Sequence, residues 1–428
     1  MGVTGAMLDQ LQLDSWRFFP AHTHPGNGLV KDSSQPHSPA SIAAIGFRLS
    51  CLPIAVARGW MARSDALHQS LISLRFLANL EQSDSPQAAG YKGFFYHFID
   101  MEDGHRAWNC ELSTIDTALL MAGVLTVAQY FDGAAADEAE ARRLGQALFE
   151  RVDWVWAQNG GAALSLGWTP ERGFLPYRWI GYSEALILYA MALGSSSHPV
   201  GADAYAEWLS GYKWRRYYGQ EYVYAGPLFI HQFSHCWIDF RGIQDDYMRE
   251  RGIDYFENSR RATYVHREYG ERNPRGFRDY HGHSWGLTAS NGPGPAERDV
   301  HGRHRKFYGY LARGAPHGPD DGTIAPWASL ASLPFAPELV LPTIEYLAAS
   351  RMLEGESYGL LSSFNPSFHV EEGDGIWNCP WHLGINQGPI VLMMENHRNG
   401  MLWQLMRRCV QLVRGLERAG FRGGWLGD

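Results

Sequence analysis

The segment 93–123, GFFYHFIDMEDGHRAWNCELSTIDTALLMAG, joins the two features that decide the fold of this chain. Its first half is a loop rich in aromatic and ionisable side chains, and its second half begins an apolar helix. Aromatic rings can cover the C–H faces of a sugar, while carboxylates bind hydroxyl groups and move protons. The segment therefore suits a cleft for a neutral, hydroxyl-rich ligand, but it equally suits a tryptophan-rich core beneath a charged loop.

Helical periodicity dominates the rest of the chain. The apolar pattern predicts helices at residues 7–18, 40–59, 64–82, 112–131, 137–157, 181–193, 203–211, 226–238, 244–268, 324–333, 336–349 and 387–418, the last interrupted near Gly400. The long segments without periodicity are 83–110, 158–180, 269–323 and 354–386, and loops of such length are commonly functional. Short strands are expected within them, at 93–98 and 360–364.

About a dozen helices with no dividing linker predict an all-α fold. We expect an (α/α)6 barrel, a toroid of six helical hairpins, with the long loops and short strands on the cleft side. Residues 1–428 would then form a single catalytic domain. Two separate helical domains are the alternative.

The bulk composition excludes several classes of protein. The chain has 428 residues and a net charge of −8 with no basic stripe, so we expect no nucleic-acid partner. The most apolar run, 41–60, is broken by Arg48, Pro53 and Arg58, which predicts no membrane insertion. We therefore expect a soluble protein, and we expect it to be a monomer. No signal peptide is visible at residues 1–14, so the protein would be periplasmic if a leader has been removed and otherwise cytoplasmic.

The five cysteines are widely spaced and form no CxxC pair. Neither a zinc knuckle nor a disulfide scaffold is therefore indicated. His231 and His235 have the i, i+4 spacing of two zinc ligands, but no Glu follows the first His as it does in HExxH. We expect no metal and no cofactor.

Glu184 is the leading candidate for a catalytic acid. It is expected in the first turn of an apolar helix, with Trp179, Tyr182 and Tyr189 nearby. Apolar surroundings keep a carboxyl group protonated at higher pH, as a general acid requires. The alternative is structural, because a first-turn Glu also interacts well with the helix dipole beside a capping Ser183.

Glu111 and Asp116 are the candidate partners of that acid. Ser113 and Asp116 match a capping box at the start of the apolar run, so Asp116 can be structural. Positions five apart on a helix point about 140° apart, so both acids reach one site only if Glu111 precedes the helix. We expect that arrangement.

Several polar and aromatic side chains are candidate contacts for a sugar. His231, Gln232 and His235 form a polar stripe that would contact sugar hydroxyls or bond the next helix. Trp285 stands in a long loop as a candidate stacking ring. The remaining candidates are Trp108, Tyr96, Arg106, Tyr182, Asn386 and Trp381.

Taken together, six strings resemble the bacterial glucoamylase-like domain family that includes the endo-β-1,2-glucanases. They are GFFYHFID at 93–100, WNCELSTIDTA at 108–118, GYSE at 181–184, HQFSHCWIDFR at 231–241, WGLTAS at 285–290, and QGPI at 387–390 with Glu395-Asn396. The resemblance spans about residues 8–418 and implies an (α/α)6 barrel that hydrolyses β-glucan, with β-1,2-linked glucan as the best-attested substrate. It also points to Glu184 as the general acid, with Glu111 and Asp116 lining the cleft.

One position departs from the family pattern. Family members often carry Asp where this chain has Asn386, and an amide cannot act as a base. We therefore expect the role of an acid at this position to be lost or shifted in this chain, which leaves the exact substrate, linkage and stereochemical outcome open. Alternatives to hydrolysis are a transglycosylase, a phosphorylase, a sugar epimerase using histidine, and a non-catalytic glycan-binding protein.

Overall fold

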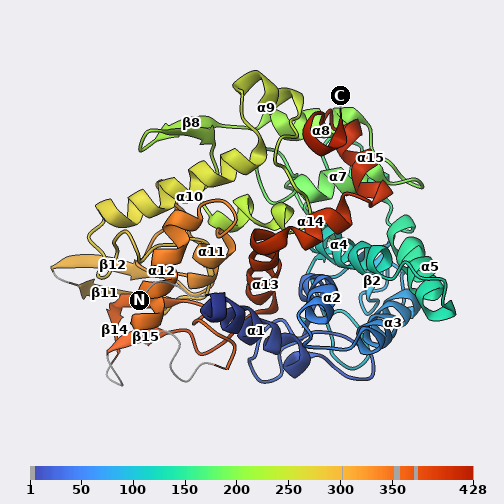
Figure 1. Cartoon of the computed structure of the whole chain (residues 1–428), viewed down its shortest axis with the longest axis horizontal. Helices are drawn as coiled ribbons and strands as arrows, with labels where there is room; N and C mark the ends of the chain where they lie inside the picture. Colours follow the sequence, from blue (N-terminus) through green and yellow to red (C-terminus); the bar gives the residue numbers. More distant parts are fainter. Residues whose placement is uncertain (1–4, 301, 351–356, 371–374, 428) are drawn as a thin grey trace.

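Helices are the main regular elements of the fold, and the strands are short (Figure 1). The computed structural model describes residues 5–300, 302–350, 357–370 and 375–427. Within these ranges the all-α prediction is confirmed. Part of the expected loop 354–386 lies outside them, at 354–356 and 371–374. No helix among the described residues is both long and apolar enough to cross a membrane.

The helices and strands follow one another along the chain in this order. The α-helices are α1 (Gly5–His22), α2 (Ile42–Ala57), α3 (Arg63–Asn79), α4 (Thr114–Tyr130), α5 (Ala136–Glu150), α6 (Trp154–Ala157), α7 (Leu186–Gly194), α8 (Ala202–Ser210), α9 (Asp246–Arg251), α10 (Tyr255–Arg272), α11 (Pro326–Ala331), α12 (Pro337–Ala349), α13 (Gly384–Asn399), α14 (Met401–Met406) and α15 (Val410–Arg418). Three 3-10 turns are η1 (Leu228–His231), η2 (Phe233–Cys236) and η3 (Gly424–Leu426).

The strands pair locally and antiparallel. The pairs are β1 (Ala40–Ser41) with β4 (Phe98–Ile99), β2 (Gly90–Tyr91) with β3 (Phe94–Phe95), β8 (Trp214–Tyr217) with β9 (Gln220–Val223), β10 (Ala289–Ser290) with β13 (Leu311–Ala312), β11 (Ala296–Val300) with β12 (Arg303–Phe307), and β14 (Phe364–His369) with β15 (Ile376–Asn378). One three-stranded sheet has the order β5 (Leu112–Ser113), β6 (Gly167–Thr169), β7 (Gly173–Phe174). These ladders tie the long loops to the ends of the helices.

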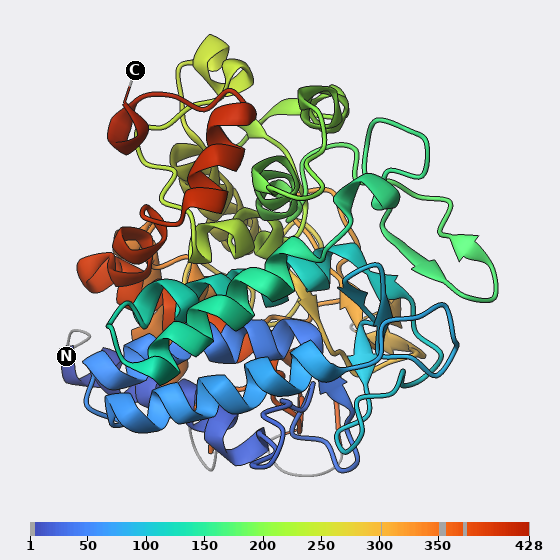
Figure 2. The same ribbon diagram turned by 90° about the vertical axis from the view of Figure 1, so that its right-hand side faces the viewer.

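The helices divide into a buried set and a half-exposed set. All residues of α7 and α11 are buried, and so are nearly all of α2, α4 and α13. By contrast, α3, α5 and α8 bury only one face. Figure 2 shows α2, α3, α4 and α5 side by side, with α2 against α4 and α3 against α5. Because a helix that is apolar all round must be enclosed, the inner helices form the core and the amphipathic ones cover it.

Two glycines bring α2 and α4 unusually close. A Cβ on Gly123 would lie 2.1 Å from the carbonyl oxygen of Gly46, and a Cβ on Gly46 would lie 2.3 Å from that of Leu119. Only hydrogen side chains fit such an approach between two backbones. The middle of α4, around Leu119 and Gly123, is thereby held against α2.

Several predicted helix boundaries are wrong, each for a local reason. The predicted helix 226–238 is two 3-10 turns, η1 and η2. The predicted helix 244–268 is split into α9 and α10, because Gly252 adopts a left-handed conformation at φ 67°. The interruption near Gly400 is confirmed, and the chain breaks again before α15. The predicted helix 181–193 starts only at Leu186, so Glu184 precedes it.

Candidate active site

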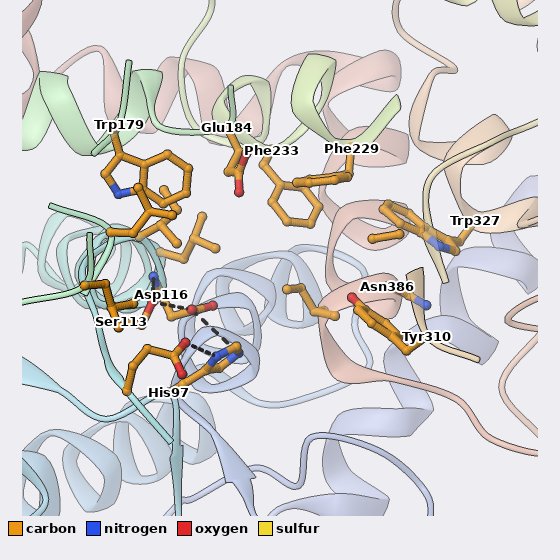
Figure 3. A pocket seen from close by; sticks show the side chains of 17 residues that line it. His97, Ser113, Asp116, Trp179, Glu184, Phe229, Phe233, Tyr310, Trp327 and Asn386 are labelled. Carbon is orange, nitrogen blue, oxygen red and sulfur yellow. Dashed lines mark hydrogen bonds and ion pairs between the residues drawn. The ribbon is translucent and has the colours of Figure 1, made fainter. Parts of the chain in front are cut away.

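A cavity of about 270 Å³ lies where the long loops meet the ends of the buried helices (Figure 3). Ionisable, aromatic and aliphatic side chains from widely separated parts of the chain line it. They are His97, Glu111, Ser113, Ile115, Asp116, Leu119, Leu166, Leu175, Trp179, Glu184, Phe229, Phe233, Ala289, Tyr310, Trp327, Ile385 and Asn386. An apolar wall with a few convergent polar groups is the usual form of a small-molecule site.

All three predicted catalytic acids line this cavity. Glu111 lies immediately before β5, ahead of α4, which confirms the expected arrangement of Glu111 and Asp116. Glu184 enters from the segment before α7 and faces Asp116 across the cavity (Figure 3). The sequence therefore identified the acids that the tertiary structure brings together.

Asp116 is held by the cap of α4. Ser113 is the N-cap residue, and its hydroxyl accepts a hydrogen bond from the backbone N–H of Asp116 at 3.2 Å. The same hydroxyl donates to Oδ2 of Asp116. Asp116 thus has the capping role that its sequence context predicts, yet its carboxylate also lines the cavity. The structural and functional interpretations of this residue are compatible.

His97 connects Asp116 with Glu111. Its Nδ1 lies 3.0 Å from Oε1 of Glu111, and its Nε2 lies 3.6 Å from Oδ2 of Asp116. Burial disfavours the charged imidazole, but the negative charges of Asp116, Glu111 and Asp32 outweigh it and raise the pKa of His97 to about 9. Burial by itself would raise the pKa of Glu111, but the hydrogen bond and the charge of His97 outweigh burial and hold that pKa below its usual value.

Asp32 adds a further acid beside this group. Its backbone N–H donates to Pro39 at 2.8 Å, and its carbonyl accepts from Gly384, the first residue of α13, at 2.9 Å. Burial is the main cause that raises the pKa of Asp32 to about 6. The positive charge of His97 opposes this rise, and the negative charge of Asp116 adds to it. The sequence analysis missed Asp32, because no spacing rule links it to the acids of segment 93–123.

Glu184 occupies a less polar part of the same cavity. Its backbone carbonyl accepts a hydrogen bond from the Ser234 hydroxyl at 3.1 Å, which fixes the segment before α7 to η2. Loss of hydration in the cavity raises the pKa of Glu184 to about 7, and the charge of Asp116 adds to the increase. The carboxyl group therefore still holds its proton near neutral pH, as a general acid must. In the structural alternative, Ser183 would cap the helix, but Ala185 is the N-cap residue of α7 and has no side-chain cap bond. The Ser183 hydroxyl instead accepts a hydrogen bond from the backbone N–H of Ala185 at 3.4 Å.

Aromatic rings form much of the remaining wall. Trp179 is oriented by a hydrogen bond from its Nε1 to the Thr114 hydroxyl at 2.9 Å. Phe229, Phe233, Trp327 and the exposed Tyr310 complete the aromatic lining (Figure 3). The phenylalanines come from the segment predicted as a polar stripe, and its polar residues point elsewhere. Only the 3-10 geometry of η1 and η2 reveals which of its side chains face the cavity.

Asn386, a predicted substrate contact, lies in the first turn of α13 and lines the cavity. Its amide Nδ2 donates to the Ser362 hydroxyl at 3.0 Å. The amide thus brings no negative charge to this part of the cavity. Among the lining residues, Glu111 and Asp116 supply negative charge beside His97.

Trp108, Arg106 and Tyr96 do not line the cavity but lie beside it. The Trp108 ring is 66% exposed and packs on Phe98, whose ring stacks 4.0 Å from that of His97. Arg106 is committed to structural bonds, to the carbonyls of Asn109 and Cys110 and to Glu171. The buried ring of Tyr96 lies beneath its guanidinium group. Of the three, Trp108 alone is free to contact a ligand.

The other predicted sugar contacts are placed in the interior or away from the cavity. The buried His231 ring contacts the Ala225 carbonyl, Gln232 donates to Ala328 and Ser332, and His235 bonds Ser259. Trp285 is buried and donates to Thr343, and Tyr182 packs among Trp208, Tyr212 and Tyr255. Trp381 is half-buried and is not among the lining residues. These positions favour the alternative that the stripe bonds neighbouring elements.

The described part of the chain contains no group of three or more His, Cys, Asp or Glu side chains arranged to hold a metal ion. The i, i+4 pair His231 and His235 is instead used in hydrogen bonds, one to a carbonyl and one to a hydroxyl.

Residues 176–410 match the family model named "Glycoamylase", described as "Putative glucoamylase". The chain belongs to this glucoamylase-like family. The matched region includes Glu184, η1, η2, α11 and the start of α13, and thus contributes one acid and most of the aromatic wall. The family resemblance predicted from the sequence is confirmed.

The chain is similar in sequence or structure to the following three proteins. An exo β-1,2-glucooligosaccharide sophorohydrolase (non-reducing end) from Parabacteroides distasonis is 25% identical over 96% of the chain, which spans 57% of that relative's length. An endo-β-1,2-glucanase structure from Chitinophaga pinensis, with sophorotriose and glucose, has a TM-score of 0.83 at 25% identity, covering 98% of this chain and 99% of that one. A Bacteroides uniformis structure with the same description as the family reaches a TM-score of 0.87 at 27% identity, with 100% of both chains covered.

Proposed function

We propose that this protein is a glycoside hydrolase that cleaves β-glucan, specifically β-1,2-linked glucan or its oligosaccharides. The relatives named as a sophorohydrolase and an endo-β-1,2-glucanase support this substrate class. The observation that carries the proposal is Glu184, a carboxyl group with a pKa of about 7 that faces a cluster of acids across an aromatic-lined cavity.

The reaction requires an acid and a base on opposite sides of the scissile bond. Glu184 would protonate the glycosidic oxygen as the bond to the anomeric carbon breaks. Asp116 or Glu111 would accept a proton from the attacking water, directly or through a sugar hydroxyl. The aromatic wall, including Trp179 and Phe233, would cover the C–H faces of the sugar and exclude water around Glu184.

We further propose that the glucan is cleaved with inversion. Inverting enzymes keep their two carboxyl groups about 6.5–9.5 Å apart to admit a water, and retaining enzymes about 5–5.5 Å apart. Glu184 and Asp116 enter the cavity from different elements, Glu184 from the segment before α7 and Asp116 from α4. NMR of the first product tests it, because inversion of a β-linkage releases the α-anomer.

The architecture behind this site is proposed to be a single (α/α)6 barrel. The enclosure of α2, α4, α7, α11 and α13 by half-exposed helices supports an inner and an outer ring. One apolar cluster that extends from Leu11 to Phe421 supports a single domain. Limited proteolysis followed by thermal unfolding tests this, since a single domain would unfold in one transition.

The decisive experiment is a reducing-sugar assay on a panel of linear and cyclic β-1,2-, β-1,3-, β-1,4- and β-1,6-glucans. We expect release of reducing sugar from the β-1,2-linked substrates. Products are then compared with and without phosphate and with added oligosaccharide. A phosphate-dependent product would instead indicate a phosphorylase, longer products a transglycosylase, and binding without any product a glycan-binding protein.

A further inference from the structure

His97 lies between Glu111 and Asp116 on one wall of the cavity. Its Nδ1 contacts Glu111 at 3.0 Å and its Nε2 lies 3.6 Å from Oδ2 of Asp116. The ring also stacks on Phe98, with 11° between the ring planes. Its backbone N–H donates to the carbonyl of Glu111 at 2.9 Å. The imidazole is thus fixed in orientation by its backbone, by a ring and by a carboxylate.

The contacts of Asp116 distinguish its two carboxylate oxygens. Oδ2 accepts a hydrogen bond from the Ser113 hydroxyl and faces Nε2 of His97. No described residue hydrogen-bonds Oδ1, and the side chain lines the cavity (Figure 3). Glu111 is arranged differently, because its Oε1 is engaged by the nearer nitrogen of His97.

We propose, on the basis of the function proposed above, that doubly protonated His97 is a positioning residue that makes Asp116 the general base. His97 and Ser113 together hold Oδ2 of Asp116, so that the other carboxylate oxygen, Oδ1, is presented to the attacking water. Glu111 acts through His97, by holding the ring and its charge in place. This assigns different roles to two acids that the sequence leaves equivalent.

The protonation state of His97 is essential to this arrangement. A neutral imidazole has one N–H and can donate to only one of the two carboxylates, whereas the imidazolium can donate to both. The charged groups around it are Asp32, Glu111 and Asp116, all acidic. Although burial opposes the charge, these acids raise the pKa of His97 to about 9, so the imidazolium prevails at neutral pH.

The hydrolytic step balances with these groups alone. The oxygen of water bonds to the anomeric carbon and its proton passes to Oδ1 of Asp116. The bond from that carbon to the glycosidic oxygen breaks, and the oxygen takes the proton of Glu184. The protein is left with a neutral Asp116 and an ionised Glu184, and exchange of protons with solvent restores both. His97 keeps its proton throughout.

The test replaces His97 by glutamine, which retains a hydrogen-bond donor but carries no charge. For His97→Gln we expect kcat on a β-1,2-glucan to fall about 10–100-fold while KM changes less than about threefold. The acidic limb of the pH profile of kcat should move to higher pH by about one unit, because the cation beside the base is lost. A residue that merely packs would not move that limb.

His105→Gln is the matched control, since His105 lies in the same loop and pairs with Asp103 at 2.8 Å but is not part of the cavity lining. It should leave kcat and the pH profile unchanged. A second measurement does not depend on activity: NMR titration of the His97 ring should give a pKa near 9 in the wild type and a lower one in Glu111→Gln.

The outcomes separate this inference from the function on which it rests. Hydrolysis of glucan by the wild type with an unchanged His97→Gln profile overturns the positioning role alone. Titration of His97 below pH 7 also overturns it. Absence of hydrolysis of every glucan by the wild type overturns the proposed function and this inference together.

Discussion

The carboxyl group of Glu184 and the carboxylate of Asp116 line opposite sides of one cavity and are electrostatically coupled. Burial is the main reason that the pKa of Glu184 rises to about 7, and the charge of Asp116 adds to it. The charge of Asp116 thereby favours the protonated form of Glu184, which is the form that a general acid needs.

Replacement of the acid gives the first prediction. Glu184→Gln removes the proton donor but keeps the size of the side chain, so kcat on β-1,2-glucan should fall about 10²–10⁴-fold. Steady-state kinetics measure the loss, with Glu207→Gln on the exposed part of α8 as control. A loss below about tenfold would exclude Glu184 as the general acid.

The pH dependence follows from the same group. The acid must be protonated to act, and its pKa is about 7, so kcat/KM should decline as the pH rises through 7. A pH profile from about 4 to 10 on a soluble oligosaccharide measures it. An alkaline limb that begins only above pH 9 would contradict the assignment.

Trp108 should contact a sugar unit outside the cavity. Its side chain is well exposed, with 66% of the residue's surface accessible. Trp108 and Asn109 both have positive φ, and Arg106 stabilises this backbone conformation by donating to the Asn109 carbonyl. Backbone strain of this kind is commonly retained at functional sites. Trp108→Ala should raise KM about 2–10-fold for long oligosaccharides and little for the shortest cleaved one.

The control for this change is Trp214→Ala, in the β8–β9 hairpin, a half-buried indole that is not part of the cavity lining. Kinetics over a series of chain lengths compare the two variants. An equal effect of Trp108→Ala at every length would argue against an outer contact.

Asn386→Asp tests the effect of a further acid in the cavity. A new carboxylate in the same cavity would repel the ionised form of Glu184 and raise its pKa further. The alkaline limb of the pH profile should therefore move to higher pH. Asn386→Ser, which adds no charge, is the control, and an unshifted limb in Asn386→Asp would show that the two groups are not coupled.

The contact between α2 and α4 gives a prediction for stability. Gly123→Ala places a methyl group 2.1 Å from the Gly46 carbonyl oxygen, so the helices must separate. We expect a loss of about 1–3 kcal/mol in the free energy of unfolding, despite the better helix propensity of alanine. Urea unfolding measures it. Gly5→Ala, with nothing within 4 Å of the added carbon, should be neutral, and an equally stable Gly123→Ala would contradict the close approach.

The sequence by itself determined the features that depend on neighbours a few positions away. It identified the apolar helices, the cap of α4 by Ser113 and the break at Gly400, because caps and helix breaks are set by local backbone chemistry. It also singled out Glu111, Asp116 and Glu184, which all line the cavity. The prediction was wrong for residues 226–238, because a helical pattern was expected where the chain forms two 3-10 turns. The side chains of His231 and Gln232 therefore point away from the direction that a helix would give them.

Only the tertiary structure decided which of these groups meet and how they titrate. His97 and Asp32 join the acids because β1 pairs with β4 and because Asp32 contacts the start of α13, and both contacts connect distant segments. The pKa values of Glu184 and His97 depend on burial and on charges from several elements. Electrostatic interactions act through space, so their pattern cannot be obtained from spacing along the chain.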